Sequence, residues 1–298
     1  MSKGCELCPR KCGADRDKAA GFCGGGALPR VAKVMLHPWE EPCICDGKGA
    51  GAVFFSGCAL RCVFCQNYKI SQRIVGDTMT KDDLAKLFLR LEEEGASCLD
   101  LVSPTPYLET LIPALEEAKK AGLSLRVVYN TSGYELPKTL SRLDGLVDVY
   151  LPDMKYKDPA LSLRYSVAAD YFDFALPALK EMRRQTGKPL FDGEKLLRGV
   201  IVRHLVLPGL WRDTRAVLQA LFDAFGADGI VLSLMRQYTP CHRTKEFPEI
   251  DRLLTTLEYD KAVRFAEELG FCTVYTQAKE SANTDYIPEF TENSQLDT

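Results

Sequence analysis

Short apolar segments alternate with longer amphipathic segments along most of this chain. From residue 52 onward the short segments are rich in β-branched and aromatic residues, which predicts strands at 52–56, 98–102, 124–129, 147–151, 199–206, 230–235 and 271–275. The longer segments place apolar residues at helical spacing and predict helices at 81–94, 107–121, 135–143, 171–184, 214–225 and 249–269. Thr80 and Asp213 suit the N-caps of two of these helices, and Gly122 and Gly270 follow the ends of two others.

Regular alternation of strand and helix is typical of parallel β-α units with helices covering the outside of the sheet. Such units form either an open doubly wound sheet or a closed or partial barrel. Six units followed by one more strand are fewer than an eight-fold barrel requires, so the α/β pattern favours a partial (β/α)6 barrel. The active site of such a barrel lies at the C-terminal ends of the strands, and we expect the functional residues there.

By composition the chain divides into three parts. Residues 1–48 are dense in Cys, Gly and Pro and lack the strand-helix rhythm, which predicts a small metal-stabilised module. Residues 49–278 form the predicted barrel, and residues 279–298 form a polar C-terminal tail.

Net charge and hydropathy limit the binding partners and the cellular location that we expect for the protein. A net charge of −3 over 298 residues argues against a broad nucleic-acid or anionic-membrane surface. No apolar run reaches the roughly 20 residues of a membrane span, and the N-terminus is polar and Cys-rich rather than a signal sequence. We therefore expect a cytoplasmic protein whose 12 cysteines serve metal binding more than disulfide formation.

Three cysteines after the first predicted strand carry the strongest functional signal. Cys58, Cys62 and Cys65 have C-x3-C-x2-C spacing and supply three thiolates, whereas a closed zinc site or an electron-carrier cluster takes four ligands. One coordination position of the metal group is then left open. The alternatives are three buried structural thiols or a zinc site that takes its fourth ligand from elsewhere in the chain.

This triplet, with an aromatic residue before its last cysteine, resembles that of the radical S-adenosylmethionine (SAM) superfamily. In that superfamily the methionyl amine and carboxylate of SAM chelate the free iron of a 4Fe-4S cluster, and one electron from the cluster cleaves SAM to a 5′-deoxyadenosyl radical. Within the superfamily, the chain looks like relatives of the pyruvate formate-lyase-activating enzyme, especially the activating-enzyme-like iron-sulfur proteins. The matching segments are 40–42, 55–58, 65–67, 130–134, 150–156, 203–209 and 237–240.

The resemblance implies roles for polar residues at predicted strand ends. Asp153 and Lys155 occupy alternate positions after the fourth strand, and the similar Asp-x-Lys pair of activating enzymes lies beside SAM. Asp153 would then meet the sulfonium and amine region, directly or through a monovalent cation, and Lys155 would meet a carboxylate. Arg203 would hold the SAM carboxylate or face the substrate. Asn130 stands where activating enzymes often carry Asp, so it keeps hydrogen-bonding capacity without the charge.

The segment after the second predicted strand departs from the superfamily pattern. Ser103 and Thr105 lie in a Ser-Pro-Thr-Pro run where many members have Gly-Gly-Glu for the methionyl amine. We expect the two hydroxyls, or backbone carbonyls of this run, to take that role. His204, beside Arg203, is equally compatible with a hydrogen-bonded packing residue and with a ligand or proton donor.

Four further cysteines lie close together near the N-terminus. Cys5, Cys8, Cys12 and Cys23 can close a tetrahedral zinc site or hold a second iron-sulfur cluster. Their spacing favours a metal over free thiols, and it does not favour iron over zinc.

The leading functional hypothesis is a radical SAM enzyme that abstracts a hydrogen atom. The activating-enzyme resemblance implies a glycine Cα–H of a partner protein as the target and a flavodoxin- or ferredoxin-like electron donor. A second hypothesis is the same chemistry on a small molecule or an RNA base, and the near-neutral charge disfavours RNA. A third is a non-catalytic iron-sulfur electron carrier. The triplet argues against it, because a carrier gains nothing from a missing fourth ligand.

Overall fold

The computed structural model describes residues 4–281 and residue 290 of the 298-residue chain. Its strands form one hydrogen-bonded network in the order β10-β9-β8-β6-β5-β4-β2-β1-β3, with β7 paired to β8. The strands are β1 (Arg30–His37), β2 (Ala50–Phe55), β3 (Asp77–Thr78), β4 (Leu99–Val102), β5 (Val127–Thr131), β6 (Val149–Pro152), β7 (Leu190–Asp192), β8 (Lys195–Leu205), β9 (Val231–Met235) and β10 (Val274–Thr276).

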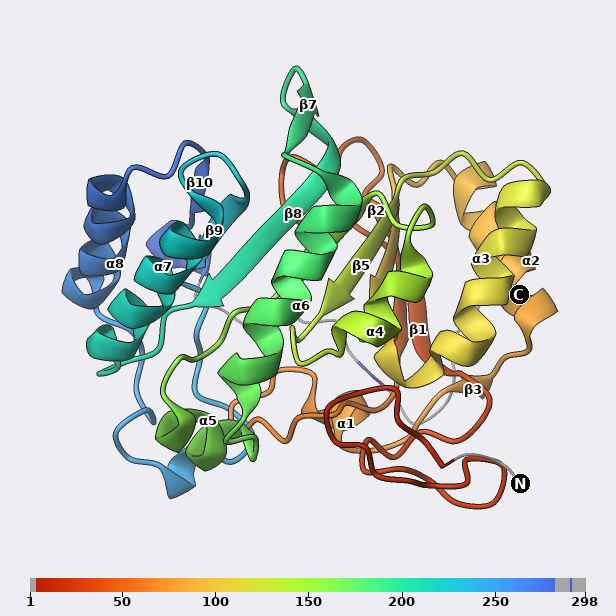
Figure 1. Ribbon diagram of the computed structural model, residues 1–298, viewed down its shortest axis with the longest axis horizontal. Coiled ribbons are helices and arrows are strands. Elements are labelled where there is room, and N and C mark those ends of the chain that lie inside the picture. Colours follow the sequence, from red (N-terminus) through yellow and green to blue (C-terminus); the bar gives the residue numbers. More distant parts are fainter. Residues whose placement is uncertain (1–3, 282–289, 291–298) are drawn as a thin grey trace.

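Neighbouring strands run parallel throughout the part of this order from β10 to β2, which consists of β10, β9, β8, β6, β5, β4 and β2. Helices cover the outer face of this parallel sheet along its length (Figure 1). The helices are α1 (Tyr68–Ser71), α2 (Lys81–Glu93), α3 (Leu108–Lys120), α4 (Pro137–Leu140), α5 (Pro159–Ser166), α6 (Tyr171–Thr186), α7 (Trp211–Phe225) and α8 (Thr256–Leu269). Since β10 and β3 are the two ends of the strand order, the sheet stays open. The predicted partial barrel of β-α units is confirmed.

Both faces of the central strands are buried, as expected for parallel strands with helices outside and a filled interior. Every residue of β2 and of β5 is buried. Val53 and Phe55 of β2 lie in the main apolar core together with Leu84 and Phe88 of α2. Helix α2 begins after Thr80, the predicted N-cap, whose side chain accepts the backbone N–H of the third helical residue.

Two predicted helix starts are wrong. Asp213 is not the N-cap of α7 but lies in its first turn, where its carboxylate accepts backbone N–H bonds from Lys157 (3.1 Å) and Asp158 (2.8 Å). The helix predicted at 249–269 begins only after Thr255, because the side chain of Thr255 caps the chain at that point. A local side-chain hydrogen bond thus fixes the start of α8, whereas α7 begins after Leu210 without a side-chain cap and uses Asp213 to hold the backbone after β6.

The strand β1 was not predicted from the sequence. It lies within residues 1–48 and pairs antiparallel with β2 along its length. The region assigned to the N-terminal module therefore contributes its last strand to the main sheet, while the division of the chain at residue 48 remains a prediction. Of the predicted tail at 279–298, the structure describes residues 279–281 and 290.

Residues 4–26 pack against the loop that follows β2. Arg10 donates to the carbonyl oxygen of Ala59 at 2.8 Å. Gly57 has a φ of +94°, and a Cβ there would meet the carbonyl oxygen of Cys23 at 2.7 Å, so this close approach requires glycine. Figure 1 shows the N-terminal segment beside α1, at the end of the sheet toward which the parallel strands point.

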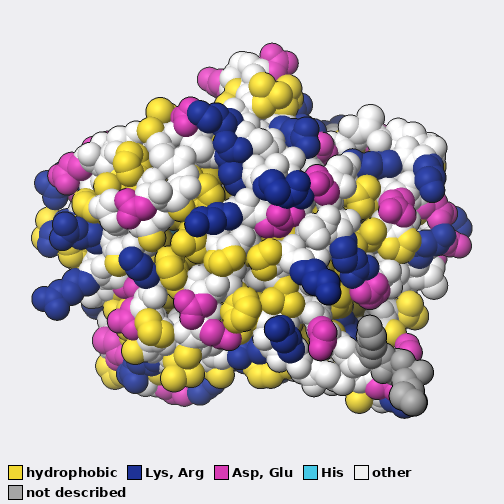
Figure 2. Space-filling model, viewed as in Figure 1, with side chains coloured by type: hydrophobic (Ala, Val, Ile, Leu, Met, Phe, Trp, Pro, Cys, Tyr) yellow, Lys and Arg dark blue, Asp and Glu magenta, His cyan; other side chains and the backbone are white. Residues whose placement is uncertain are grey.

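In the described ranges, no helix is long and apolar enough to cross a membrane. On the face shown in Figure 2, Lys and Arg side chains are interspersed with Asp and Glu. This mixture agrees with the near-zero net charge and gives this face no broad surface of one sign.

Candidate active site

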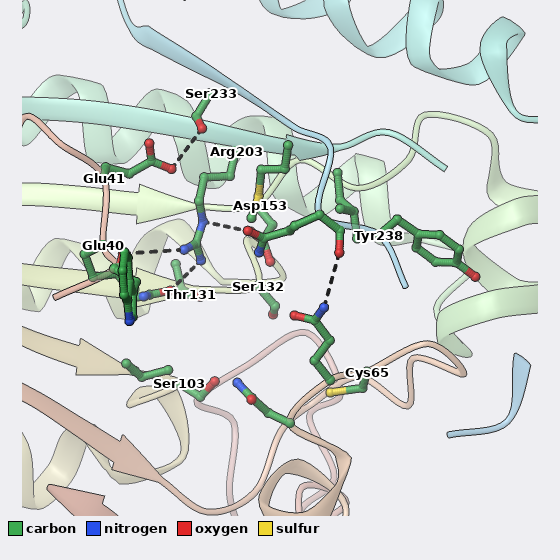
Figure 3. A pocket seen from close by; sticks show the side chains of 18 of the residues that line it. Glu40, Glu41, Cys65, Ser103, Thr131, Ser132, Asp153, Arg203, Ser233 and Tyr238 are labelled. Carbon is green, nitrogen blue, oxygen red and sulfur yellow. Dashed lines mark hydrogen bonds and ion pairs between the residues drawn. The ribbon is translucent and has the colours of Figure 1, made fainter. Parts of the chain in front are cut away.

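A cavity of about 690 Å³ lies inside the partial barrel (Figure 3). Its wall is formed by the loop after β2, by the ends of β4, β5, β6, β8 and β9, and by the segment that joins β1 to β2. Most of the site residues predicted from the sequence line this cavity. They are Cys58, Cys62, Cys65, Ser103, Asn130, Asp153, Lys155 and Arg203.

Each thiol of the triplet has a hydrogen-bond partner. Cys62 is buried, and Cys58 and Cys65 are half-buried. The partners are the Leu60 backbone N–H, which donates to Cys58 at 3.4 Å, the Ser166 hydroxyl, which donates to Cys62 at 3.0 Å, and the Ser71 hydroxyl, which lies 3.2 Å from Cys65. Hydrogen bonds of this kind stabilise sulfur that carries negative charge, as cluster-bound thiolates do.

Burial, together with the neighbouring thiols of the triplet, raises the pKa of the Cys58 and Cys65 thiols to about 12. Three thiolates this close are unfavourable unless positive charge lies between them, and the irons of a cluster supply that charge. Three converging thiols with hydrogen-bond donors therefore fit a 4Fe-4S cluster that keeps one iron free of protein ligands.

Among the described residues, no three His, Cys, Asp or Glu side chains converge on one point that a single metal ion could occupy, either at the triplet or at the N-terminal cysteines. A cubane cluster attaches each thiolate to a different iron, so its ligands do not have to meet at one point.

Asp153 connects the two cations of the cavity. Its carboxylate accepts from Lys155 Nζ at 2.6 Å and from Arg203 Nε at 3.2 Å. Burial by itself would raise the pKa of Asp153, but the Lys155 and Arg203 charges outweigh it and hold that pKa below its usual value. The same Asp153 charge raises the pKa of Lys155. All three groups are therefore charged at neutral pH.

Arg203 also contacts Asn130 and Glu40, in addition to Asp153. It donates to Asn130 Oδ1 at 2.6 Å and forms a longer ion pair of 3.9 Å with Glu40. Glu41, next in the chain, accepts from the Ser233 hydroxyl at 2.8 Å. Sequence reasoning gave no role to Glu40, Glu41 or Ser233, although the matching segment 40–42 was a usable signal for the first two.

Ser103 and Thr105 have different surroundings. Ser103 directly follows β4 with a φ of +58°, an unusual conformation for a residue other than glycine, and it lines the cavity. The described cavity wall does not include Thr105, whose hydroxyl contacts Glu135 and accepts from the Tyr129 hydroxyl at 3.3 Å. The short 3-10 helix Thr105–Tyr107 directs this side chain into the protein.

His204 is a packing residue. Its ring is buried, with Nδ1 2.7 Å from the carbonyl oxygen of Met154 and Nε2 3.1 Å from the Thr214 hydroxyl. Burial lowers its pKa to about 4, so the ring is neutral. Both ring nitrogens are thus already used within the fold.

The four N-terminal cysteines lie near one another. The thiols of Cys12 and Cys23 lie 3.1 and 3.8 Å from the point where a Cβ on Gly21 would stand. Burial raises the pKa of Cys8 to about 12, and the nearby Cys23 and Cys5 thiols contribute to this shift. The backbone contact of Cys23 with Gly57 places this group directly behind the triplet loop.

Comparison with known proteins identifies the family. Residues 52–215 match the sequence model of the Radical SAM superfamily, and this chain belongs to that superfamily. The match includes the cysteine triplet, Asp153, Lys155 and Arg203. The uncharacterized protein MJ0674 of Methanocaldococcus jannaschii is 29% identical over 289 residues, which cover 92% of this chain and 77% of that protein.

Two solved structures, methylornithine synthase PylB and SuiB, have a similar fold. Methylornithine synthase PylB superposes with a TM-score of 0.53 at 14% identity, over 95% of this chain and 79% of PylB. Streptococcus suis SuiB bound to S-adenosylmethionine gives a TM-score of 0.53 at 12% identity, over 79% of this chain. The chain spans about half the length of SuiB (51%). At these identities the likeness concerns the fold.

We expect Ser166→Ala to lower the reduction potential of the bound cluster. The Ser166 hydroxyl donates to Cys62, and a hydrogen bond to the sulfur stabilises the more negative, reduced state. Losing about 1.4 kcal/mol of such stabilisation corresponds to about 60 mV for one electron. Ser162→Ala is the matched control, because Ser162 is also buried on α5 but donates to Pro159. Redox titration followed by EPR measures both variants, and an unchanged potential in Ser166→Ala would contradict the expectation.

Proposed function

We propose that this chain uses radical SAM chemistry to abstract a hydrogen atom from a glycine Cα of a partner protein. Membership in the superfamily supports the coarser part, cleavage of SAM to a radical at an iron-sulfur cluster. The observation that carries the proposal is that the cysteine triplet shares one cavity with Asp153, Lys155 and Arg203. Three thiols that would leave one iron open therefore line the same cavity as charged groups that would suit SAM.

Residues of this chain would bind and orient SAM there. The three thiolates would hold three irons and leave the fourth to the methionyl amine and carboxylate. Asp153 would face the cationic part of SAM, and Lys155 and Arg203 would place positive charge near its carboxylate. Ser103 and Asn130 offer oxygen acceptors to an ammonium group. A monovalent cation beside Asp153 remains a prediction. Both carboxylate oxygens of Asp153 already accept hydrogen bonds, one from Lys155 and one from Arg203.

A polypeptide substrate is supported by two observations. A cavity of about 690 Å³ can admit SAM and a short extended segment but not a folded domain. SuiB, whose fold is similar, has been crystallised with its precursor peptide SuiA. The choice of glycine, and of a flavodoxin- or ferredoxin-like electron donor, rests on the resemblance to activating enzymes.

The other two hypotheses have weaker support. A small molecule would also fit the cavity, whereas an RNA base is disfavoured by the net charge of −3. An electron carrier would not need a cavity with charged residues beside its cluster.

Transfer of deuterium tests the glycine proposal. The reconstituted, reduced protein is incubated with SAM and an anaerobic extract of its own source cells grown on α-deuterated glycine. We expect deuterium in the 5′-deoxyadenosine that forms, and we expect it only with the protein fraction of the extract. Deuterium that depends on the small-molecule filtrate instead, or no deuterium at all, would contradict a protein glycine as the hydrogen donor.

We further propose that Cys5, Cys8, Cys12 and Cys23 hold a second metal group, either an iron-sulfur cluster or zinc. Residues 1–26 have too little apolar periodicity to fold by packing alone, so metal would stabilise them. A variant with all three triplet cysteines replaced by Ala should still bind iron or zinc, which elemental analysis measures. A folded variant without metal would overturn this proposal.

A further inference from the structure

The inner end of the cavity is acidic. Glu40 and Glu41 lie in the segment between β1 and β2, which crosses the barrel at the N-terminal ends of its strands. This segment is fixed by a backbone hydrogen bond from Leu196 to the Cys43 carbonyl at 2.7 Å and by Arg126, which donates to the Ile44 carbonyl at 3.1 Å. Figure 3 shows both carboxylates on the far side of Arg203 from Cys65.

Carboxylates outnumber cations on the described cavity wall. Glu40, Glu41 and the buried Asp100 of β4 surround Arg203, whose guanidinium already pairs with Asp153 at the shorter distance of 3.2 Å. Lys155 is likewise paired with Asp153. Two further cations lie nearby. Arg126 donates to the carbonyl oxygens of Leu196, Ile44 and Ser97, and Lys33 lies near His37, where its charge adds to burial in lowering the pKa of the ring. Burial raises the pKa of Glu40 and of Glu41 in the absence of a further cation.

One buried polar atom of the cavity wall, His37 Nδ1, has no hydrogen-bond partner among the described residues. Asp100 lies behind the described wall and contacts Glu40, and burial raises the pKa of Asp100 well above its usual value, so the two carboxyl groups can share a proton. The His37 side chain is 7% exposed and lines the cavity, and burial lowers its pKa, so the neutral ring can accept a hydrogen bond. Buried acceptors without donors are uncommon in folded proteins, and a ligand that donates a hydrogen bond would satisfy this one.

We propose that Glu40, Glu41 and His37 form a substrate subsite that takes a cationic nitrogen group, an ammonium or a guanidinium. Such a group brings both the positive charge and the N–H donors that this end of the cavity lacks. The inference rests on the proposed function, which places SAM at the cysteine end. The ammonium of SAM is the other source of this chemistry, but its chelation of the cluster iron would hold it beside the triplet, across Arg203 from these carboxylates.

Agmatine, which carries an ammonium and a guanidinium, is a suitable probe. Its binding to cluster-loaded protein is measured by calorimetry with and without SAM, beside neutral 1,6-hexanediol and anionic adipate as length-matched controls. The EPR signal of the reduced cluster reports SAM binding in the same samples. We expect agmatine to bind at least tenfold more tightly than the diol and adipate to bind more weakly still.

Two variants locate the effect. Glu41→Gln keeps the shape of the side chain and should weaken agmatine binding at least fivefold. Glu116→Gln, on the exposed face of α3, makes the same change in net charge and should leave agmatine binding unchanged.

Results that contradict the subsite differ from results that contradict the proposed function. Equal affinity for agmatine and the diol, or equal weakening in both variants, would overturn the subsite. Displacement of SAM by agmatine would also overturn it and assign these carboxylates to the SAM ammonium. A cluster signal that does not respond to SAM would instead count against the proposed function, while the agmatine titration without SAM would still decide whether the acidic end binds cations.

Discussion

Cys62→Ala is expected to abolish SAM cleavage. Cys62 is the buried member of the triplet, and its loss would leave the cluster two protein ligands, too few to hold four irons and present one open iron to SAM. We expect at least a 1000-fold fall in 5′-deoxyadenosine formation, about 4 kcal/mol in the barrier. Chromatographic measurement of 5′-deoxyadenosine after anaerobic reconstitution gives the result.

Cys98→Ala is the matched control for this variant. Cys98 is also a buried thiol, but it packs in a separate apolar cluster with Val128 and Val149. It should therefore keep the cleavage activity of the parent. Parent-level cleavage by Cys62→Ala, or equal loss in both variants, would show that the ligand assignment is wrong.

Asp153→Asn is expected to weaken both SAM binding and the fold. From the sequence, a strand-end carboxylate of this kind is expected to contribute little to stability. The structure gives a reason for a larger contribution, because the side chain is only 20% exposed and bridges Lys155 and Arg203. Removing one partner of a buried charge group costs about 3 kcal/mol of unfolding free energy. Loss of the charge that we propose faces SAM should weaken SAM binding at least tenfold, about 1.4 kcal/mol.

Asp144→Asn is the control for the Asp153 variant. Asp144 pairs with Arg184, and both side chains are about half exposed (45% and 56%), so its loss should cost no more than about 1 kcal/mol. Denaturant unfolding and calorimetry with SAM separate the two effects. A destabilised Asp153→Asn that binds SAM as tightly as the parent would limit Asp153 to a structural role.

The elements that could be predicted are those with strong apolar periodicity. The strands β4, β5 and β6 and the helices α2 and α3 occur close to their expected positions, because each buries a regular apolar face. The strand β1 was missed because it lies in a region whose Cys, Gly and Pro content indicated a metal module. Its strand structure depends on pairing with β2, which is a tertiary contact.

The candidate site could be predicted where a motif fixes the geometry. The five residues predicted from the triplet spacing and the Asp-x-Lys pair all line the same cavity. Thr105 could not be placed, since one turn of 3-10 helix rotates it away. Glu40 and Glu41 reach the cavity because the segment between β1 and β2 crosses the barrel at the N-terminal ends of its strands. The course of this segment depends on tertiary contacts and cannot be predicted from local sequence.

Cleavage of SAM at the triplet cluster is measured by the formation of 5′-deoxyadenosine by the reconstituted protein. The protein is loaded with iron and sulfide under anaerobic conditions, reduced with dithionite and incubated with SAM. We predict 5′-deoxyadenosine and methionine in equal amounts from the parent, and neither product from Cys62→Ala. Intact SAM in the presence of a fully formed, reduced 4Fe-4S cluster in the parent protein would show that the cluster does not cleave SAM.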